Sequence, residues 1–488
     1  MAPKQPRHAA QGPVTFNAPG AAMTEARGPK SEVPPQAKMI AGGFIAVLLA
    51  VLWIATSETA ASAATAGMQR AFRIKDSAAE LAANPNGGSP ILVAKTNLQQ
   101  GQPFLSIPAE SVLDMRSLSE HAVGKMLQAD NGTVINQLAQ EHQITQGGFS
   151  IMNHAIFLAL EKRKGSGSKW YSWLNAVAAP TASILFWPQE TEVCMDRSIA
   201  AEGIQLQRTL NATVAAAAQL CESDFGAEAG CKGQPITEAE AKWAIGVYVQ
   251  NNFQDQAIIP MVNFMAFDNT KPPAQPQFDQ KTNTLNFNAG GPIARGSPIT
   301  AQFLRGPQML LAATGQFDAE TARGVELALN FQQEDEAIQK ICAPQVHEMQ
   351  FGPNGKPRKG LVDCMFVLVA DDKQKKKLLK NFRKGKTPVI EALAYGNLTV
   401  AASRMATEDG FNAAACDAAP ESSLKTALKD WAAYRTKVLT ANAQYLEQLM
   451  VQKYAAAGIP MPQPQQPAEE AQPDDAAAFG SASDEPEV

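Results

Sequence analysis

The residues of this sequence that could carry chemistry are six cysteines, five histidines and one dense cluster of lysines. The cysteines are an even number, which a chain in an oxidising compartment can join as up to three disulfides. They are Cys194, Cys221, Cys231, Cys342, Cys364 and Cys416. Cys221 and Cys231 flank a loop-like segment and are the first predicted pair. Buried free thiols remain the alternative interpretation, because a free cysteine packs as a small hydrophobic side chain.

The histidines are scattered along the chain, and none has a serine or cysteine partner in a known nucleophile motif. They are His8, His121, His142, His154 and His347. Cysteine and histidine spacings typical of zinc ligands are also missing from the sequence, so we predict no metal site. Without a phosphate loop or a dinucleotide fingerprint, the sequence argues against kinases, ATPases and dehydrogenases.

The basic cluster runs from Lys373 to Lys386. One interpretation is a surface that contacts anionic lipid headgroups or an acidic partner. The favoured interpretation is the solvated face of an amphipathic helix that turns Leu378, Leu379 and Phe382 inward. Because the formal net charge of the whole chain is −5, we expect no nucleic-acid partner.

An uncharged apolar stretch covers residues 39–56, close to the roughly 20 residues that cross a bilayer. It predicts a transmembrane helix at 39–58, and a cleaved signal peptide is the alternative. More basic residues precede this stretch than closely follow it, which favours a cytosolic N-terminus. We therefore expect a single-pass membrane protein that contacts the bilayer through residues 39–56, with its main domain lumenal or extracellular.

Two segments have compositions typical of disorder, residues 1–38 and the Pro-rich, acidic residues 459–488. Between them the sequence predicts strands at 91–94 and 104–108, and helices at 150–163 and 197–220. Thr237 and Glu240 form a capping box that predicts a helix to about residue 251.

Further along, short strands are predicted within 285–303, and amphipathic helices at 319–346 and 421–455. Asn354-Gly355 predicts a turn before a strand at 361–370. A boundary near residue 318 then separates a strand-containing domain from a mainly helical one.

The order of these elements resembles the SET-domain proteins of the Rubisco large-subunit methyltransferase type. The similar segments are 94–108, 170–174, 186–188, 236–244, 293–299 and 434–439. The resemblance implies an α+β fold of small sheets: a SET-like domain at 75–318 with a helical insert at about 110–255, then a helical, substrate-binding-like domain at 319–458.

The resemblance also implies transfer of a methyl group from S-adenosylmethionine to a lysine or histidine side chain of a protein. Gly87 and Gly88 lie where the family's glycine-rich cofactor loop is expected. Asn263 stands at the family's aspartate position, and Asn269 could substitute for a lost contact. Thr314 replaces the tyrosine that aims the amine.

The sequence departs from the family at the Asn-His pair, which is Ala266-Phe267 here. Alanine and phenylalanine cannot make the polar contacts of asparagine and histidine. Three hypotheses follow: a catalytically impaired SET-fold module that binds a protein partner, an active methyltransferase with a rebuilt pocket, or a disulfide-held lumenal scaffold unrelated to SET.

Overall fold

A computed structural model describes residues 58–460 of the chain with short gaps. The gaps are residues 76, 86–87, 130–136, 139, 254–256, 269, 302–305, 328, 330–334, 344–347 and 408–409. The predicted disordered arm, and the predicted tail from residue 461 onward, lie outside the described residues. All described residues belong to one compact unit, Ser57–Val488.

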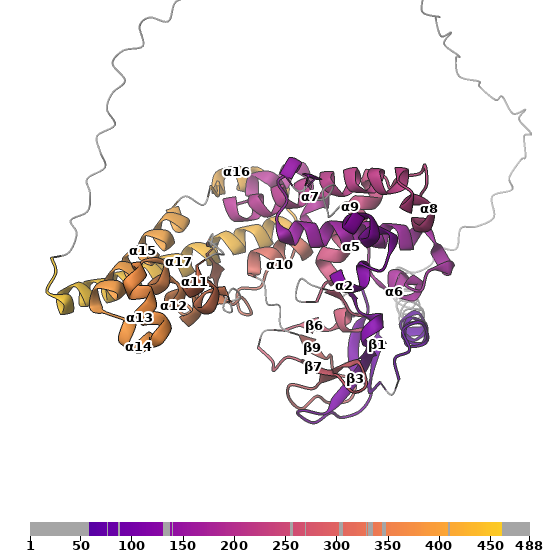
Figure 1. The fold of residues 1–488 in the computed structure, drawn as a ribbon, viewed down its shortest axis with the longest axis horizontal. Coiled ribbons are helices and arrows are strands. Elements are labelled where there is room, and N and C mark those ends of the chain that lie inside the picture. Colours follow the sequence, from indigo (N-terminus) through magenta and orange to yellow (C-terminus); the bar gives the residue numbers. More distant parts are fainter. Residues whose placement is uncertain are drawn as a thin grey trace, which may run out of the picture. The chain divides into compact units, whose positions relative to one another are not determined.

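The strands form several small sheets (Figure 1). The pairs are β1 (Ala79–Ala82) with β2 (Ile91–Ala94), β8 (Thr284–Asn288) with both β3 (Pro103–Pro108) and β7 (Gln275–Asp279), β4 (Leu113–Asp114) with β5 (Ala257–Ile258), β6 (Ala266–Phe267) with β9 (Thr300–Ala301), and β10 (Val325–Glu326) with β11 (Gln350–Phe351). Phe104 and Phe287 hold β3 against β8, with ring centroids 6.4 Å apart. The predicted strands at 91–94 and 104–108 are therefore confirmed.

Three long helices of the predicted insert lie side by side: α5 (Gln146–Arg163), α7 (Arg197–Glu222) and α9 (Glu238–Asn251). The capping box that begins α9 is confirmed, since Glu240 N donates to Thr237 Oγ1 at 3.3 Å and Thr237 N donates to Glu240 Oε2 at 2.8 Å. The shorter helices around them are α2 (Met115–Leu118), α3 (Ala122–Gln128), α6 (Tyr171–Ala176) and α8 (Phe225–Ala229).

The C-terminal region is mainly helical, as expected. Its elements are α10 (Pro307–Thr314), α11 (Glu336–Ile341), α12 (Lys359–Leu368), α13 (Asp372–Lys380), α14 (Phe382–Gly385), α15 (Pro388–Thr407), α16 (Ala413–Ala418) and α17 (Ser423–Ala457). The helix predicted at 421–455 is confirmed as α17. The long helix predicted at 319–346 is wrong, because the described part of that range holds β10 and the short α11.

The strand predicted at 361–370 is also wrong, because this segment is α12. Its apolar run reads equally well at strand and helix spacing. Leu361, Cys364 and Met365 lie on one helical face and are buried, and Cys364 is bonded to Cys342 beside α11. Packing in the tertiary structure therefore decides between the two.

The structure corrects the predicted membrane anchor. Within the described ranges no helix is both long and apolar enough to cross a bilayer, which contradicts the transmembrane helix at 39–58 and the single-pass, lumenal or extracellular localisation. Residues 39–57 themselves lie outside the described ranges. The helix that follows, residues 58–71, buries Ala61 and Met68 in the protein core, and Leu81 N of β1 donates to Thr65 Oγ1 at 2.9 Å. The side chains of Ala61 and Met68 therefore pack against protein.

A buried contact joins the helical insert to α17. Asp196, 1% exposed, caps α7 and accepts hydrogen bonds from Ile199 N at 2.9 Å and from Trp431 Nε1 at 2.8 Å. Arg435 Nε lies 3.5 Å from the same carboxylate. A charge so fully removed from water is stabilised only when it is paired and hydrogen-bonded, so these residues fix α17 against α7.

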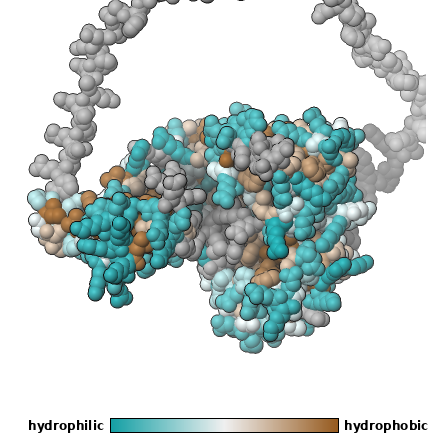
Figure 2. Space-filling model, in the orientation of Figure 1, coloured by the Kyte–Doolittle hydropathy of each residue, from teal (hydrophilic) through white to brown (hydrophobic). Residues whose placement is uncertain are grey.

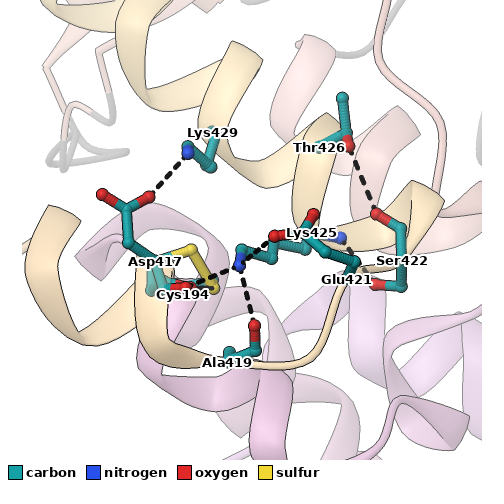
Figure 3. Close-up of polar contacts among 9 residues, drawn as sticks. Cys194, Asp417, Ala419, Glu421, Ser422, Lys425, Thr426 and Lys429 are labelled. Carbon is teal, nitrogen blue, oxygen red and sulfur yellow. Dashed lines mark hydrogen bonds and ion pairs between the residues drawn. A yellow bond between two sulfur atoms is a disulfide. The ribbon is translucent and has the colours of Figure 1, made fainter.

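The disulfide Cys194–Cys416 lies beside this contact and links the insert to α16. The buried Lys425 Nζ stabilises the turn between α16 and α17. It donates to Asp417 O at 2.9 Å, Ala419 O at 2.7 Å and Glu421 Oε1 at 2.8 Å (Figure 3). The turn between α16 and α17 is therefore held by one covalent bond and one ammonium group.

All six cysteines are paired, as Cys194–Cys416, Cys221–Cys231 and Cys342–Cys364. The predicted pair Cys221–Cys231 is confirmed. The alternative of buried free thiols is wrong.

Replacing Cys194 and Cys416 by alanine should destabilise the fold more than replacing Cys221 and Cys231. The first disulfide spans 222 residues and the second 10, and a longer loop removes more entropy from the unfolded chain. Loop entropy predicts losses of about 5 and about 3 kcal/mol. All four cysteines are buried, so the two double variants lose side chains from equally buried positions. Urea denaturation measures the difference, and equal losses would contradict it.

His154, on α5, is fully buried between two carbonyl groups. Its Nδ1 lies 2.7 Å from Ser150 O, its Nε2 lies 3.2 Å from Leu113 O, and its ring stacks on Tyr248 at 4.4 Å. A neutral imidazole carries one N–H, so it can donate to only one of these carbonyls. Burial nevertheless lowers the pKa of His154, which keeps the ring neutral.

The free energy of unfolding should therefore fall as the pH drops below about 6.5, where the histidine of the unfolded chain takes up a proton that the folded chain resists. A single proton gives a slope of up to about 1.4 kcal/mol per pH unit. His154→Gln should flatten this slope between pH 7 and 5 relative to the wild-type chain. Urea titrations at several pH values test this, and an unaltered slope in His154→Gln would refute it.

Candidate functional site

Asn263 lies in a short 3-10 turn, Val262–Phe264, and both ends of its carboxamide are engaged within the fold. Its Oδ1 accepts from Trp173 Nε1 of α6 at 3.0 Å. Its Nδ2 donates to Asn251 Oδ1, at the end of α9, at 3.3 Å. Trp173 is fully buried, so its indole N–H depends on this acceptor. Asn263 thus fastens the turn to two helices of the insert.

Thr314 is the last residue of α10, and its hydroxyl bonds within its own chain segment. Oγ1 donates to Leu310 O at 2.7 Å and accepts from Gln316 N at 3.3 Å. Gly315 follows with a φ of 65°, and a Cβ there would lie 3.2 Å from Ala182 O. Glycine is needed at this helix end for both reasons.

The end of α9 brings the Asn263 and Thr314 positions into one region. Asn251 contacts Asn263, and the preceding residue, Gln250, donates from Nε2 to Ala313 O at 2.9 Å. The two positions that the sequence singled out are therefore neighbours of the same helix terminus. The Asn263 side chain joins the turn to α6 and α9, whereas the Thr314 hydroxyl bonds only within the end of α10.

The predicted glycine loop is only partly described. Gly87 and Asn269 lie outside the described residues. Gly88 is exposed and has a φ of 84°, a conformation that favours glycine. Next to it, Ser89 Oγ accepts from Ala178 N at 2.8 Å, and β2, which follows, packs beside the turn that carries Asn263. The structure therefore brings the loop and Asn263 to adjacent elements.

Ala266 and Phe267 form β6, which runs parallel to β9. The Phe267 side chain is 44% exposed. This strand thus presents a methyl group and a phenyl ring where the resemblance implies an amide and an imidazole.

A cleft of about 420 Å³ opens beyond these positions, between the segment after α10 and the segment from β11 to α12. The sequence analysis did not predict it. Its lining residues are Thr270, Glu320, Thr321, Ala322, Arg323, Glu348, Gln350, Pro353 and Arg358. They come from separate parts of the chain, so no local motif marks the cleft.

Backbone and side-chain contacts fix one wall of this cleft. Tyr434 of α17 donates to Ala322 O at 3.2 Å, and burial raises the pKa of Tyr434 to about 12. Arg358 Nη2 donates to Arg323 O at 3.1 Å. Burial, and then the nearby Arg358, lower the pKa of Arg323. Two guanidinium groups are therefore held close together at the cleft.

Gln350 of β11 adds a buried amide to the same cleft. The residue is 2% exposed, and its Nε2 has no hydrogen-bond partner among the described residues. A buried donor without a partner favours an acceptor from outside the fold. Together with Glu320 and Glu348, these groups suit a polar, charged polypeptide segment.

Sequence comparisons give no match: no family profile and no curated protein matches the chain. Solved structures do match. The SET domain of LSMT bound to lysine and AdoHcy superposes with a TM-score of 0.52 at 13% identity, covering 80% of this chain and 92% of that one. Rubisco LSMT bound to AdoMet gives 0.51 at 12% identity, covering 80% and 93%. The chain has the SET-domain fold of these Rubisco LSMT structures.

Proposed function

We propose that this chain is a SET-fold protein that binds a segment of another polypeptide in the cleft between Arg323 and Arg358, and that it does not transfer methyl groups. The observation that carries the second part is the double engagement of Asn263 by Trp173 and Asn251. With one bond accepted and one donated inside the fold, the orientation of the Asn263 carboxamide is set by Trp173 and Asn251, which supports a structural role for this residue.

Two further contacts support the loss of methyl transfer. The Thr314 hydroxyl donates back to Leu310 O, and it is shorter than the phenol that the resemblance implies. Ala266 and Phe267 lack the donors and acceptors that would fix an adenosyl group. The residues present do not fit S-adenosylmethionine, so we derive no reaction step through it.

An active methyltransferase is the second candidate. It is favoured by the bound ligands of the similar structures, AdoMet and AdoHcy, and by the positive φ of Gly88 in the loop before β2. The two candidates differ in one measurable property, the affinity of the chain for S-adenosylmethionine.

S-adenosylmethionine at about 1 mM should neither release heat on titration into the full chain nor raise its melting temperature, since a ligand that binds only the folded state must stabilise it. Saturable binding would overturn the proposal.

Asn263→Ala should lower the free energy of unfolding by about 1–3 kcal/mol, because it leaves the buried Trp173 N–H without an acceptor. Asn211→Ala is the matched control, since Asn211 is exposed on α7. Asn263→Ala also separates the proposed function from the active methyltransferase. If Asn263 binds the cofactor, S-adenosylmethionine should stabilise the wild-type chain and not the variant.

Binding in the cleft can be tested by selecting peptides from a displayed random library on the full chain. Selected peptides should carry an Asp or Glu alongside a Lys or Arg, because two arginines and two glutamates line the cleft. Arg358→Gln should weaken them at least about tenfold, the effect of losing one charge-assisted hydrogen bond of about 1.4 kcal/mol. Arg116→Gln, at an exposed arginine of α2, is the control. Equal binding to both variants would place the peptides elsewhere and contradict the cleft.

A further inference from the structure

The basic cluster of the sequence forms an exposed surface on α13 and α14. Figure 2 shows hydrophilic residues gathered over these two helices. Lys375 is paired with Asp335 at 2.6 Å and Lys386 with Asp363 at 3.2 Å. The remaining cations are exposed and have no ion-pair partner among the described residues: Lys373, Lys376, Lys377, Lys380, Arg383 and Lys384. We call these six residues the basic face.

An apolar notch of about 280 Å³ lies next to the basic face. Ile341, Leu378, Leu379 and Phe382 line it, together with Lys340 and Asp363. Asp363 is already paired with Lys359 and Lys386, so its charge is compensated. The notch therefore suits an apolar side chain, and its surroundings suit negative charge.

The chain itself contains a segment of this chemistry. Residues 459–488 carry seven carboxylates and no Lys or Arg: Glu469, Glu470, Asp474, Asp475, Asp484, Glu485 and Glu487. The segment has one aromatic residue, Phe479, which follows Asp474-Asp475 after three alanines. An acidic pair and a large apolar side chain are thus spaced closely enough to meet the basic face and the notch together.

The segment begins at the end of α17, close to the notch. The last turns of α17 pack beside the first turns of α15, where Lys453 Nζ lies 2.7 Å from Glu391 Oε2. On α15, Tyr395 contacts Phe366 with ring centroids 5.9 Å apart, and Phe366 lies 6.4 Å from Phe382 of the notch. A stretch of 22 residues, the length from Gly458 to Phe479, reaches up to about 70 Å when extended, which is enough to cover this path.

We infer that the acidic segment around Asp474-Asp475 binds the basic face of its own chain, with Phe479 in the notch. The basic face attracts the carboxylates of the segment, and insertion of Phe479 into the notch fixes which residues of the segment lie against it. Tethering raises its local concentration to the order of millimolar, so even a weak contact is populated. The inference is independent of the proposed function.

Carbodiimide coupling in the full chain, followed by peptide mass spectrometry, tests it, because this reagent joins carboxylates to lysines that they touch. We expect links from Asp474 or Asp475 to Lys376, Lys377 or Lys380 within the monomer band. The exposed ion pairs Asp417–Lys429 and Glu228–Lys125, each at 2.6 Å, are internal positive controls. Absence of the tail links while both controls form would overturn the inference.

Three comparisons separate this contact from other origins of the same cross-links. Phe479→Ala should reduce the tail links at least fivefold, whereas Met461→Ala should leave them unchanged; equal yields would overturn the anchored contact. Links found only in a dimer band would show that the segment bridges two copies, and would also overturn it. Raising the ionic strength to about 1 M should remove the links, since screening then acts within about 3 Å.

Discussion

The buried carboxylate of Asp196 is the contact on which the arrangement of this chain depends. It caps the N-terminus of α7, accepts a hydrogen bond from Trp431 and lies beside the guanidinium of Arg435. Removing one partner would leave a charge without compensation inside the protein, which is far more destabilising than losing an exposed ion pair. The nearby Cys194–Cys416 disulfide and the buried Lys425 stabilise the same contact region, so the insert and α17 form one framework.

Within this framework, two side chains that the sequence analysis singled out form hydrogen bonds inside the fold. Asn263 fastens a turn to α6 and α9, and Thr314 ends α10 by bonding to Leu310. Charged and polar side chains also line the cleft of about 420 Å³, Arg358 and the buried Gln350 among them.

Sequence patterns predicted the local features well. The capping box at Thr237, the strand at 91–94 and the Cys221–Cys231 pair each depend on residues close together in the chain. Features that depend on tertiary packing escaped prediction. The apolar run of α12 fits strand or helix spacing, and Cys194–Cys416 is one of many pairings that six cysteines allow. The apolar residues of 58–71 likewise have partners in the core that no hydropathy pattern identifies.

The tie between Tyr434 and Ala322 has a consequence for molecular recognition. It connects the wall of the cleft to α17, which Asp196 and the Cys194–Cys416 bond immobilise. A cleft wall braced in this way is preorganised, so for the polypeptide that we propose as its ligand, most of the conformational entropy lost on docking would come from the ligand. Differences in affinity between such ligands would then be expressed mainly in their rates of dissociation.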